Sequence, residues 1–217
     1  MTPQQFDDIN LLPEKDNENI LRSISALGIS DKPFYIEVIP DIDAINGDCF
    51  VNVIKKVNTS KGEMILGWQF AEYSFMIEAE FHAVWKAPEG KLIDITPSAD
   101  QTATKILFVI DHRKKFDGKR TDNFRFNTTS NELVDDMIEI EKAKFKLTNN
   151  TKEIDTTGRL IFRGYESIKW QEVNFISLTI DDMCRQNATI KSNCFCNSGL
   201  TYELCHRHIL REFLSTI

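Results

Sequence analysis

Residues 75–96 read Phe-Met-Ile-Glu-Ala-Glu-Phe-His-Ala-Val-Trp-Lys-Ala-Pro-Glu-Gly-Lys-Leu-Ile-Asp-Ile-Thr. The first half of this stretch is dense in aromatic and β-branched residues, which favour strands. Residues 87–90 then bring Pro and Gly together, which is the chemistry of a tight turn. The stretch therefore predicts a β-hairpin with strands at 75–85 and 91–96.

The segments on either side of this hairpin predict further strands and several helices. Aromatic and β-branched runs indicate strands, whereas apolar residues three and four positions apart indicate helices. Strands are expected at 33–40, 64–70 and 104–110, and helices at 17–27, from Asp48 to about Val57, and from Asn131 to about Lys146. These elements predict a β-meander packed against helices, so the predicted fold class is α+β.

The composition is that of an ordinary folded protein. Of 217 residues, 41% are hydrophobic, 27% are charged and fifteen are Phe, which argues against disorder. No run approaches the roughly 18 apolar residues of a membrane span, and the first residues lack the basic-then-apolar pattern of a signal peptide. We therefore expect a cytoplasmic protein that does not bind membranes.

The net charge of −7 bears on the choice of partner. An acidic surface repels phosphate backbones, and no basic patch stands out in the sequence. Nucleic acid is therefore disfavoured as a partner. Nucleic-acid binding is the weakest of the functional hypotheses, because it requires a strong salt dependence that this charge balance disfavours.

A polar stretch at 148–158 marks the best linker in the chain, because it offers little to bury. It follows the last predicted helix. We expect an α+β domain at 1–147, a linker with a helical or mixed segment at 148–190, and a small C-terminal module at 191–217.

Four of the potential metal ligands in this module are paired in sequence. Cys194-Phe-Cys196 is followed, after residues 197–204, by Cys205-His206. Clustered cysteines in a reducing compartment are metal ligands more often than disulfides, and Cys sulfur with His nitrogen suits tetrahedral zinc. The sequence thus predicts one structural Zn²⁺ ion, with His208 left open as an alternative fourth ligand.

The same residues resemble the SEC-C motif, a small zinc module found at the tail of the SecA translocase motor and on many other bacterial proteins. The resemblance covers residues 192–208, including both ligand pairs and Ser198-Gly199. Asn197 stands where Gly is usual, and Asn also tolerates a positive φ. The resemblance implies a docking role towards a protein partner or the ribosome.

A second group of residues carries the chemistry of a cysteine nucleophile. Cys49 falls in the first turn of a predicted helix, where the helix dipole favours a thiolate. His82 on the first hairpin strand can act as a base, and Asp94 on the second can orient its ring. These three residues are the predicted catalytic triad, and Glu80, on the same strand face as His82, can orient that ring or join a metal site.

The hairpin register decides whether His82 and Asp94 meet. If Lys86 faces Gly90, His82 faces Asp94, whereas a pairing of Lys86 with Lys91 turns Asp94 to the other face. The triad therefore requires a three-residue loop or a bulge. Trp68 and Gln69 on the preceding strand are candidates for the border of the pocket.

Residues 45–97 resemble the transglutaminase-like branch of the papain-like superfamily. Gly47-Asp48-Cys49, His82-Ala83 and Asp94 follow the order of its motifs, although Asp94-Ile-Thr-Pro97 replaces the usual Asp-Pro-Thr. The resemblance implies a papain-like helix packed on an antiparallel sheet, and a cysteine hydrolase or acyltransferase acting on an amide or ester of a protein or peptide. Peptidase, deamidase and transglutaminase-like activities all remain open.

The rival hypothesis is a noncatalytic zinc-binding adaptor. A lone Cys on the buried face of a helix usually acts as a small hydrophobic residue. In that case Cys49 is packing, and the zinc module alone carries the function by docking on a protein or the ribosome.

Overall fold

The computed structural model describes residues 9–10, 12–98, 103–150 and 160–217, and these divide into two units, Met1–Phe126 and Asn127–Ile217. The first unit contains β1 (Ile9–Asn10), α1 (Glu18–Ala26), β2 (Phe34–Val38), α2 (Cys49–Ser60), β3 (Glu63–Tyr73), β4 (Met76–Lys86), β5 (Leu92–Asp94), β6 (Lys105–Ile110) and β7 (Phe124–Asn127). The second contains α3 (Glu132–Asn150), α4 (Tyr165–Arg185), α5 (Tyr202–Cys205) and α6 (Arg207–Leu214). The predicted α+β class is confirmed.

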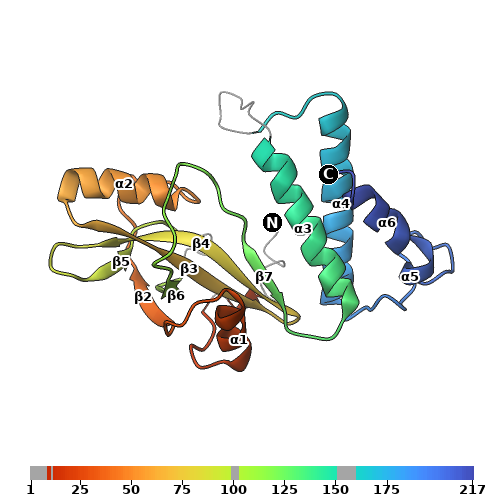
Figure 1. The fold of residues 1–217 in the computed structure, drawn as a ribbon, viewed down its shortest axis with the longest axis horizontal. Helices are drawn as coiled ribbons and strands as arrows, with labels where there is room; N and C mark the ends of the chain where they lie inside the picture. Colours follow the sequence, from red (N-terminus) through yellow and green to blue (C-terminus); the bar gives the residue numbers. More distant parts are fainter. Residues whose placement is uncertain (1–8, 11, 99–102, 151–159) are drawn as a thin grey trace. The chain divides into compact units, whose positions relative to one another are not determined.

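Five strands of the first unit form a closed barrel. Their order is β3-β6-β2-β5-β4, and β3 pairs with β4 to close the ring, while β1 and β7 extend it at β3 and β4 (Figure 1). Four of the five barrel pairs are antiparallel, and β2 runs parallel to β5. The expected antiparallel meander therefore covers β3, β4 and β5 only, because β6 leaves it to pair with β2 and β3.

The hairpin between β4 and β5 adopts neither of the two registers considered above. Lys86 pairs with Leu92 and Trp85 with Ile93, so the loop comprises residues 87–91. Within it, the amide of Ala87 donates to Lys91 O at 2.9 Å and Gly90 has a φ of +93°. Extending this register puts Asp94 opposite Val84, on the same face as His82 and diagonal to it. The longer loop thus keeps both residues on one face without a direct pairing.

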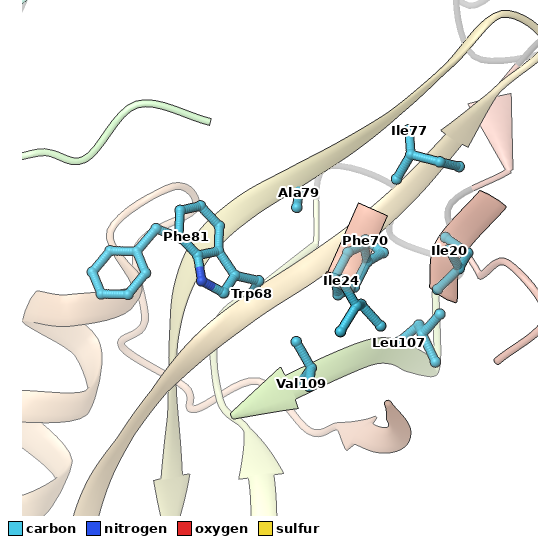
Figure 2. Close-up of a cluster of buried hydrophobic side chains, with 9 residues drawn as sticks. All are labelled: Ile20, Ile24, Trp68, Phe70, Ile77, Ala79, Phe81, Leu107 and Val109. Carbon is cyan, nitrogen blue, oxygen red and sulfur yellow. The ribbon is translucent and has the colours of Figure 1, made fainter. Parts of the chain in front are cut away.

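The outer face of β3 and β4 carries both helices of the first unit. Figure 2 shows α1 bringing Ile20 and Ile24 against Trp68, Phe70 and the apolar residues of β4 and β6. Helix α2 packs on another part of this face, where Cys49 and Val53 contact a cluster with Ala83 and Ile95. Alternation along the strands therefore sends His82 to the opposite face, into the barrel.

Large apolar residues fill the barrel interior beside His82. Ile36, Val84, Ile106 and Phe108 form a buried cluster there. Gly67, which pairs with His82, has no room for a side chain, because a Cβ atom would lie 2.4 Å from Cζ of Phe108. Bulky residues are thus excluded from the position directly across from the His82 ring.

Two long helices and a short C-terminal module build the second unit. Helices α3 and α4 lie side by side (Figure 1), and α6 contacts α3. The predicted end of the N-terminal domain, at residue 147, falls inside α3. The whole of this helix belongs to the C-terminal unit. Of the expected linker, residues 151–158 lie outside the described residues, and α4 occupies most of the segment that follows. No helix within the described ranges is long and apolar enough to cross a bilayer.

Candidate functional site

The C-terminal module brings its four predicted ligands together. Its first part is a tight hairpin in which the amide of Cys194 donates to Leu200 O at 2.9 Å, and Asn197 adopts a φ of 56°. The tolerance of Asn197 for this backbone conformation is therefore confirmed. The second ligand pair lies at the end of α5. There the amide of Cys205 donates to Thr201 O at 3.0 Å.

The ligand atoms of Cys194, Cys196, Cys205 and His206 all lie within 4.8 Å of one another. Nδ1 of His206 is 3.2 Å from Sγ of both Cys194 and Cys205, and Sγ of Cys196 is 3.5 Å from Sγ of Cys205. Ligand atoms around tetrahedral zinc are separated by roughly 3.5–3.8 Å when the metal–ligand bonds are about 2.0–2.3 Å. The donor set and its spacing fit one such ion, and His208 is not part of the cluster.

The thiols of this cluster differ in their acidity. Burial raises the pKa of Cys194 to about 11, whereas a hydrogen bond with Ser198 is the main reason that the pKa of Cys196 falls to about 7. A metal binds thiolates, so its binding must displace protons, above all from Cys194. Cys184, in contrast, is buried in α4 outside the cluster, and burial raises its pKa to about 12.

A buried ion pair anchors the module to α3. Nε of Arg207, next to the ligand His206, donates to Oδ2 of Asp136 at 2.7 Å, and both side chains are less than a tenth exposed. Arg211 and Glu132 add further contacts to this pair. The ligand-bearing turn is thereby fixed to a long helix.

The second candidate site begins at the first residue of α2. Cys49 occupies that position, as predicted, and it is 3% exposed. Its buried neighbours in the helix are Asn52 and Val53. The loop before it turns at Gly47, which has a φ of +79°.

Asn52 braces this loop. Its Oδ1 accepts from the amide of Ile45 at 2.9 Å, while Nδ2 donates to Ile45 O at 2.8 Å and to Oγ1 of Thr96 at 3.2 Å. The amide of Thr96 in turn donates to Oδ1 of Asp94 at 2.9 Å. The sequence interpretation missed both Asn52 and Thr96. The available signal was an Asn three residues after Cys49, on the buried face of an apolar helix.

His82 lies between Asp94 and Cys49. Its Nε2 is 3.2 Å from Oδ2 of Asp94, and both side chains are about 95% buried. Burial by itself lowers the pKa of His82, but interactions with Asp94 and Cys49 outweigh burial and hold the pKa well above its ordinary value. Neither ring nitrogen has a well-aligned hydrogen bond among the described residues, so these contacts are close without ideal geometry.

The three predicted residues line one cavity of about 240 Å³. Gln69, Glu78, Glu80 and Thr96 also line it, with Asn46 and Gly47 from the loop before α2. Trp68 does not, because it faces the outer apolar cluster and its Nε1 donates to Oδ2 of Asp111 at 3.1 Å. Of the two residues proposed for the pocket border, only Gln69 lies there.

Glu80 lines the cavity without a hydrogen bond or ion pair to another described residue, and no metal cluster of His82, Asp94 and Glu80 exists among the described side chains. Among the described residues, the only cluster of potential metal ligands is the one formed by Cys194, Cys196, Cys205 and His206.

Neither site is matched by a known relative. Comparison with protein-family models, curated proteins and solved structures finds no match to this chain. The geometry of the two sites therefore carries the functional conclusions.

Proposed function

We propose that this protein is a cysteine-dependent hydrolase or acyltransferase that acts on an amide or ester bond. The observation that carries the proposal is the 3.2 Å approach of His82 Nε2 to Asp94 Oδ2 beside the thiol of Cys49, in one cavity. The raised pKa of His82 favours an imidazolium at neutral pH, the partner that a thiolate nucleophile requires. The finer fold assignment, a papain-like or transglutaminase-like domain, belongs to the same proposal.

The reaction uses the three residues in turn. The Cys49 thiolate attacks the carbonyl carbon, and the His82 imidazolium gives its proton to the departing amine or alcohol as the carbon–heteroatom bond breaks. Water, or an amine in a transferase, then attacks the thioester and loses its proton to His82. The carbon–sulfur bond breaks and the Cys49 thiolate returns. Asp94 orients the ring throughout.

The N-terminus of α2 supplies a hydrogen-bond donor to the site. Cys49 is the first residue of α2, so its backbone N–H belongs to the unpaired donors at a helix N-terminus. Such donors stabilise the oxyanion that forms during acyl transfer. Gln69, which also lines the cavity, is the candidate for a second donor.

Cys49 labelling tests the proposal. Iodoacetamide should label Cys49 of the zinc-loaded protein at pH 6, and His82→Ala should slow that labelling at least about tenfold, because the thiolate loses its imidazolium. Peptide mass spectrometry separates Cys49 from Cys184, which is buried and serves as the internal reference. Slow labelling that is indifferent to His82 would identify Cys49 as packing and remove the enzyme proposal.

The alternative function is a noncatalytic adaptor that docks through the zinc module. The favouring observation is an apolar cavity of about 370 Å³ beside the ligand His206, lined by Phe175, Ile209 and Phe213 among others. Phe175 and Ile209 are 61% and 51% exposed. On this alternative a protein surface, that of the ribosome included, covers them. Loss of every partner interaction in Cys194→Ser, with none lost in Cys49→Ala, would favour the adaptor.

A further inference from the structure

The cavity that holds Cys49 has an unbalanced charge. Its ionisable lining residues are Cys49, Glu78, Glu80, His82, Asp94 and Tyr73. Three of these are carboxylates and only one is a cation at neutral pH. No Lys or Arg lines the cavity among the described residues.

Two of the three carboxylates have partners. Oε1 of Glu78 lies 2.9 Å from Nε of Arg125 and accepts from Nδ2 of Asn123 at 3.1 Å, while Oε2 accepts from the Tyr73 hydroxyl at 3.2 Å. Asp94 is paired with His82 and with the amide of Thr96. The negative charges of Glu78 and Asp94 therefore already have partners within the protein.

Glu80 differs from both. It has neither a hydrogen bond nor an ion pair among the described residues, and it stands directly across from Gln69 on β3. Its side chain lines the cavity at an exposed position of β4. Desolvation, followed by repulsion from Glu78 and Asp94, raises the pKa of Glu80 against the opposing attraction of His82 and Arg120.

His82 gives an independent indication that a ligand completes this cavity. It is 5% exposed, and both of its ring nitrogens are buried without an aligned hydrogen-bond partner. A buried polar group in a folded protein normally has such a partner. A bound substrate that tightens the site would supply one or bring the existing neighbours into line.

We propose, as an extension of the proposed function, that the acyl donor carries a cationic nitrogen and that Glu80 binds it. A carboxylate with no internal partner attracts an ammonium or guanidinium group and repels an anion. Glu80 and His82 are two residues apart on one strand face, a separation of about 7 Å. The cationic nitrogen therefore lies several bonds from the scissile carbonyl.

Two thiol reagents of opposite charge test the charge preference without requiring a known substrate. The cationic trimethylammonioethyl and the anionic sulfonatoethyl methanethiosulfonates differ in their charged end group. Their rates at Cys49 are measured at pH 8, where the carboxylate is ionised, and are divided by their rates with N-acetylcysteine. We expect a cationic preference of about tenfold in the wild type that falls to about twofold or less in Glu80→Gln.

A matched control removes the same charge elsewhere. Glu89→Gln, in the exposed hairpin loop, should leave the preference at its wild-type value, since Glu89 does not line the cavity. Circular dichroism confirms that each variant is folded, and Glu80→Ala repeats the test should Gln itself form new hydrogen bonds.

Ester substrates then distinguish the sources of the cation. Cys49-dependent hydrolysis of 4-nitrophenyl 6-aminohexanoate is compared with that of the hexanoate, and hydrolysis of the glycinate with that of the acetate. Preference for the aminohexanoate indicates a side-chain-like ammonium, and preference for the glycinate an α-ammonium. A preference for the aminohexanoate that Glu80→Gln abolishes supports the proposal, whereas a preference confined to the glycinate contradicts the distance between Glu80 and the scissile carbonyl.

The outcomes separate this inference from the function on which it rests. Reactive Cys49 with equal corrected rates for both reagents, in wild type and Glu80→Gln alike, overturns the cation proposal and leaves the hydrolase proposal standing. A Cys49 that reacts with neither reagent overturns both.

Discussion

The side chain of Asn52 joins Ile45, in the loop that precedes Cys49, to Thr96, whose amide holds Asp94. The buried side-chain amide of Asn52 thus links the segment that carries Cys49, the nucleophile of the proposed triad, to the segment that carries Asp94. Among the described residues, Asn52 forms a hydrogen bond with neither the ring of His82 nor the thiol of Cys49, so it acts as a positioning residue.

Replacing Asn52 should affect both stability and the site. Asn52→Ala removes the hydrogen bonds from the Asn52 side chain to the backbone of Ile45 and to Thr96, which should cost about 1–2 kcal/mol of unfolding free energy. Urea unfolding measures this cost. Cys49 labelling at pH 6 should also slow, whereas Asn58→Ala, at an exposed position of the same helix outside the cavity, is the control. Unchanged labelling in a destabilised Asn52→Ala would reduce Asn52 to a structural role.

Asp94 should control the protonation of His82. Because burial alone lowers the His82 pKa, Asp94→Asn should bring that pKa down from its raised value. Titration of the ring by NMR measures the shift, with the exposed His208 as internal reference. A His82 pKa that stays high in this variant would show that Cys49 rather than Asp94 holds the proton.

The same pair predicts a pH dependence of stability. A raised folded-state pKa contributes stability that is complete below about 6.5 and is lost as the pH rises through the folded-state value. The destabilisation caused by Asp94→Asn should therefore be larger at pH 6 than at pH 9. Denaturant unfolding at the two pH values decides this, and a larger loss at pH 9 would contradict the assignment.

Metal content should follow the four clustered ligands. Cys194→Ser and His206→Ala should each lose most of the bound zinc, and a chelator should unfold the module of the wild type, because binding energy is folding energy in such sites. Cys184→Ala and His208→Ala should keep about one zinc per chain, since neither residue belongs to the cluster. Elemental analysis after dialysis gives the stoichiometry, and zinc retained by His206→Ala would reopen the choice of fourth ligand.

Asp136 should be the strongest single anchor of the C-terminal module. Asp136→Asn leaves the buried Arg207 guanidinium with only the exposed carboxylate of Glu132 as counter-charge, which should cost about 3 kcal/mol. Glu139→Gln breaks an exposed pair with Lys142 on the same helix and should cost less than about 1 kcal/mol. Equal losses in the two variants, measured by urea unfolding of zinc-loaded protein, would contradict this.

Asp111 should contribute to acid resistance. Hydrogen bonds from Arg113 are the main reason that the pKa of Asp111 falls to about 2, and the Trp68 indole adds another. A lowered pKa contributes stability above the unfolded value near 3.8 that is lost as the pH falls through about 2. Because Arg113 is 55% exposed, we expect Asp111→Asn to cost only about 1–2 kcal/mol at pH 7, and less at pH 3.

Trp68 fluorescence reports this unfolding, since its indole bonds to Asp111 directly. Asp43→Asn is the matched control, because Asp43 is 74% exposed and pairs only loosely with Lys55. A pH-independent cost in Asp111→Asn would mean that packing rather than charge explains the effect.

Local patterns were sufficient to predict most elements. Asn17 caps α1 and Gly28 follows it at positive φ, Cys49 opens α2, and the strands of the central hairpin lie within two residues of their predicted ends. β7 was missed, because its alternation of Phe and polar residues spans only four positions in a polar region, which is the shortest run that indicates a strand. α4 was only partly foreseen, since its apolar residues do not all lie on one face.

The sequence by itself determined the ligand set of the metal cluster, because all four ligands lie within one short segment whose turn residues bring them together. It also determined which residues had the chemistry of a triad. Only the tertiary structure decided that His82 and Asp94 meet, since their proximity depends on a hairpin register and a closed barrel that no local pattern specifies. It alone also decided that Asn52 joins the loop before Cys49 to Thr96, because Asn52 and Thr96 are 44 residues apart in the chain.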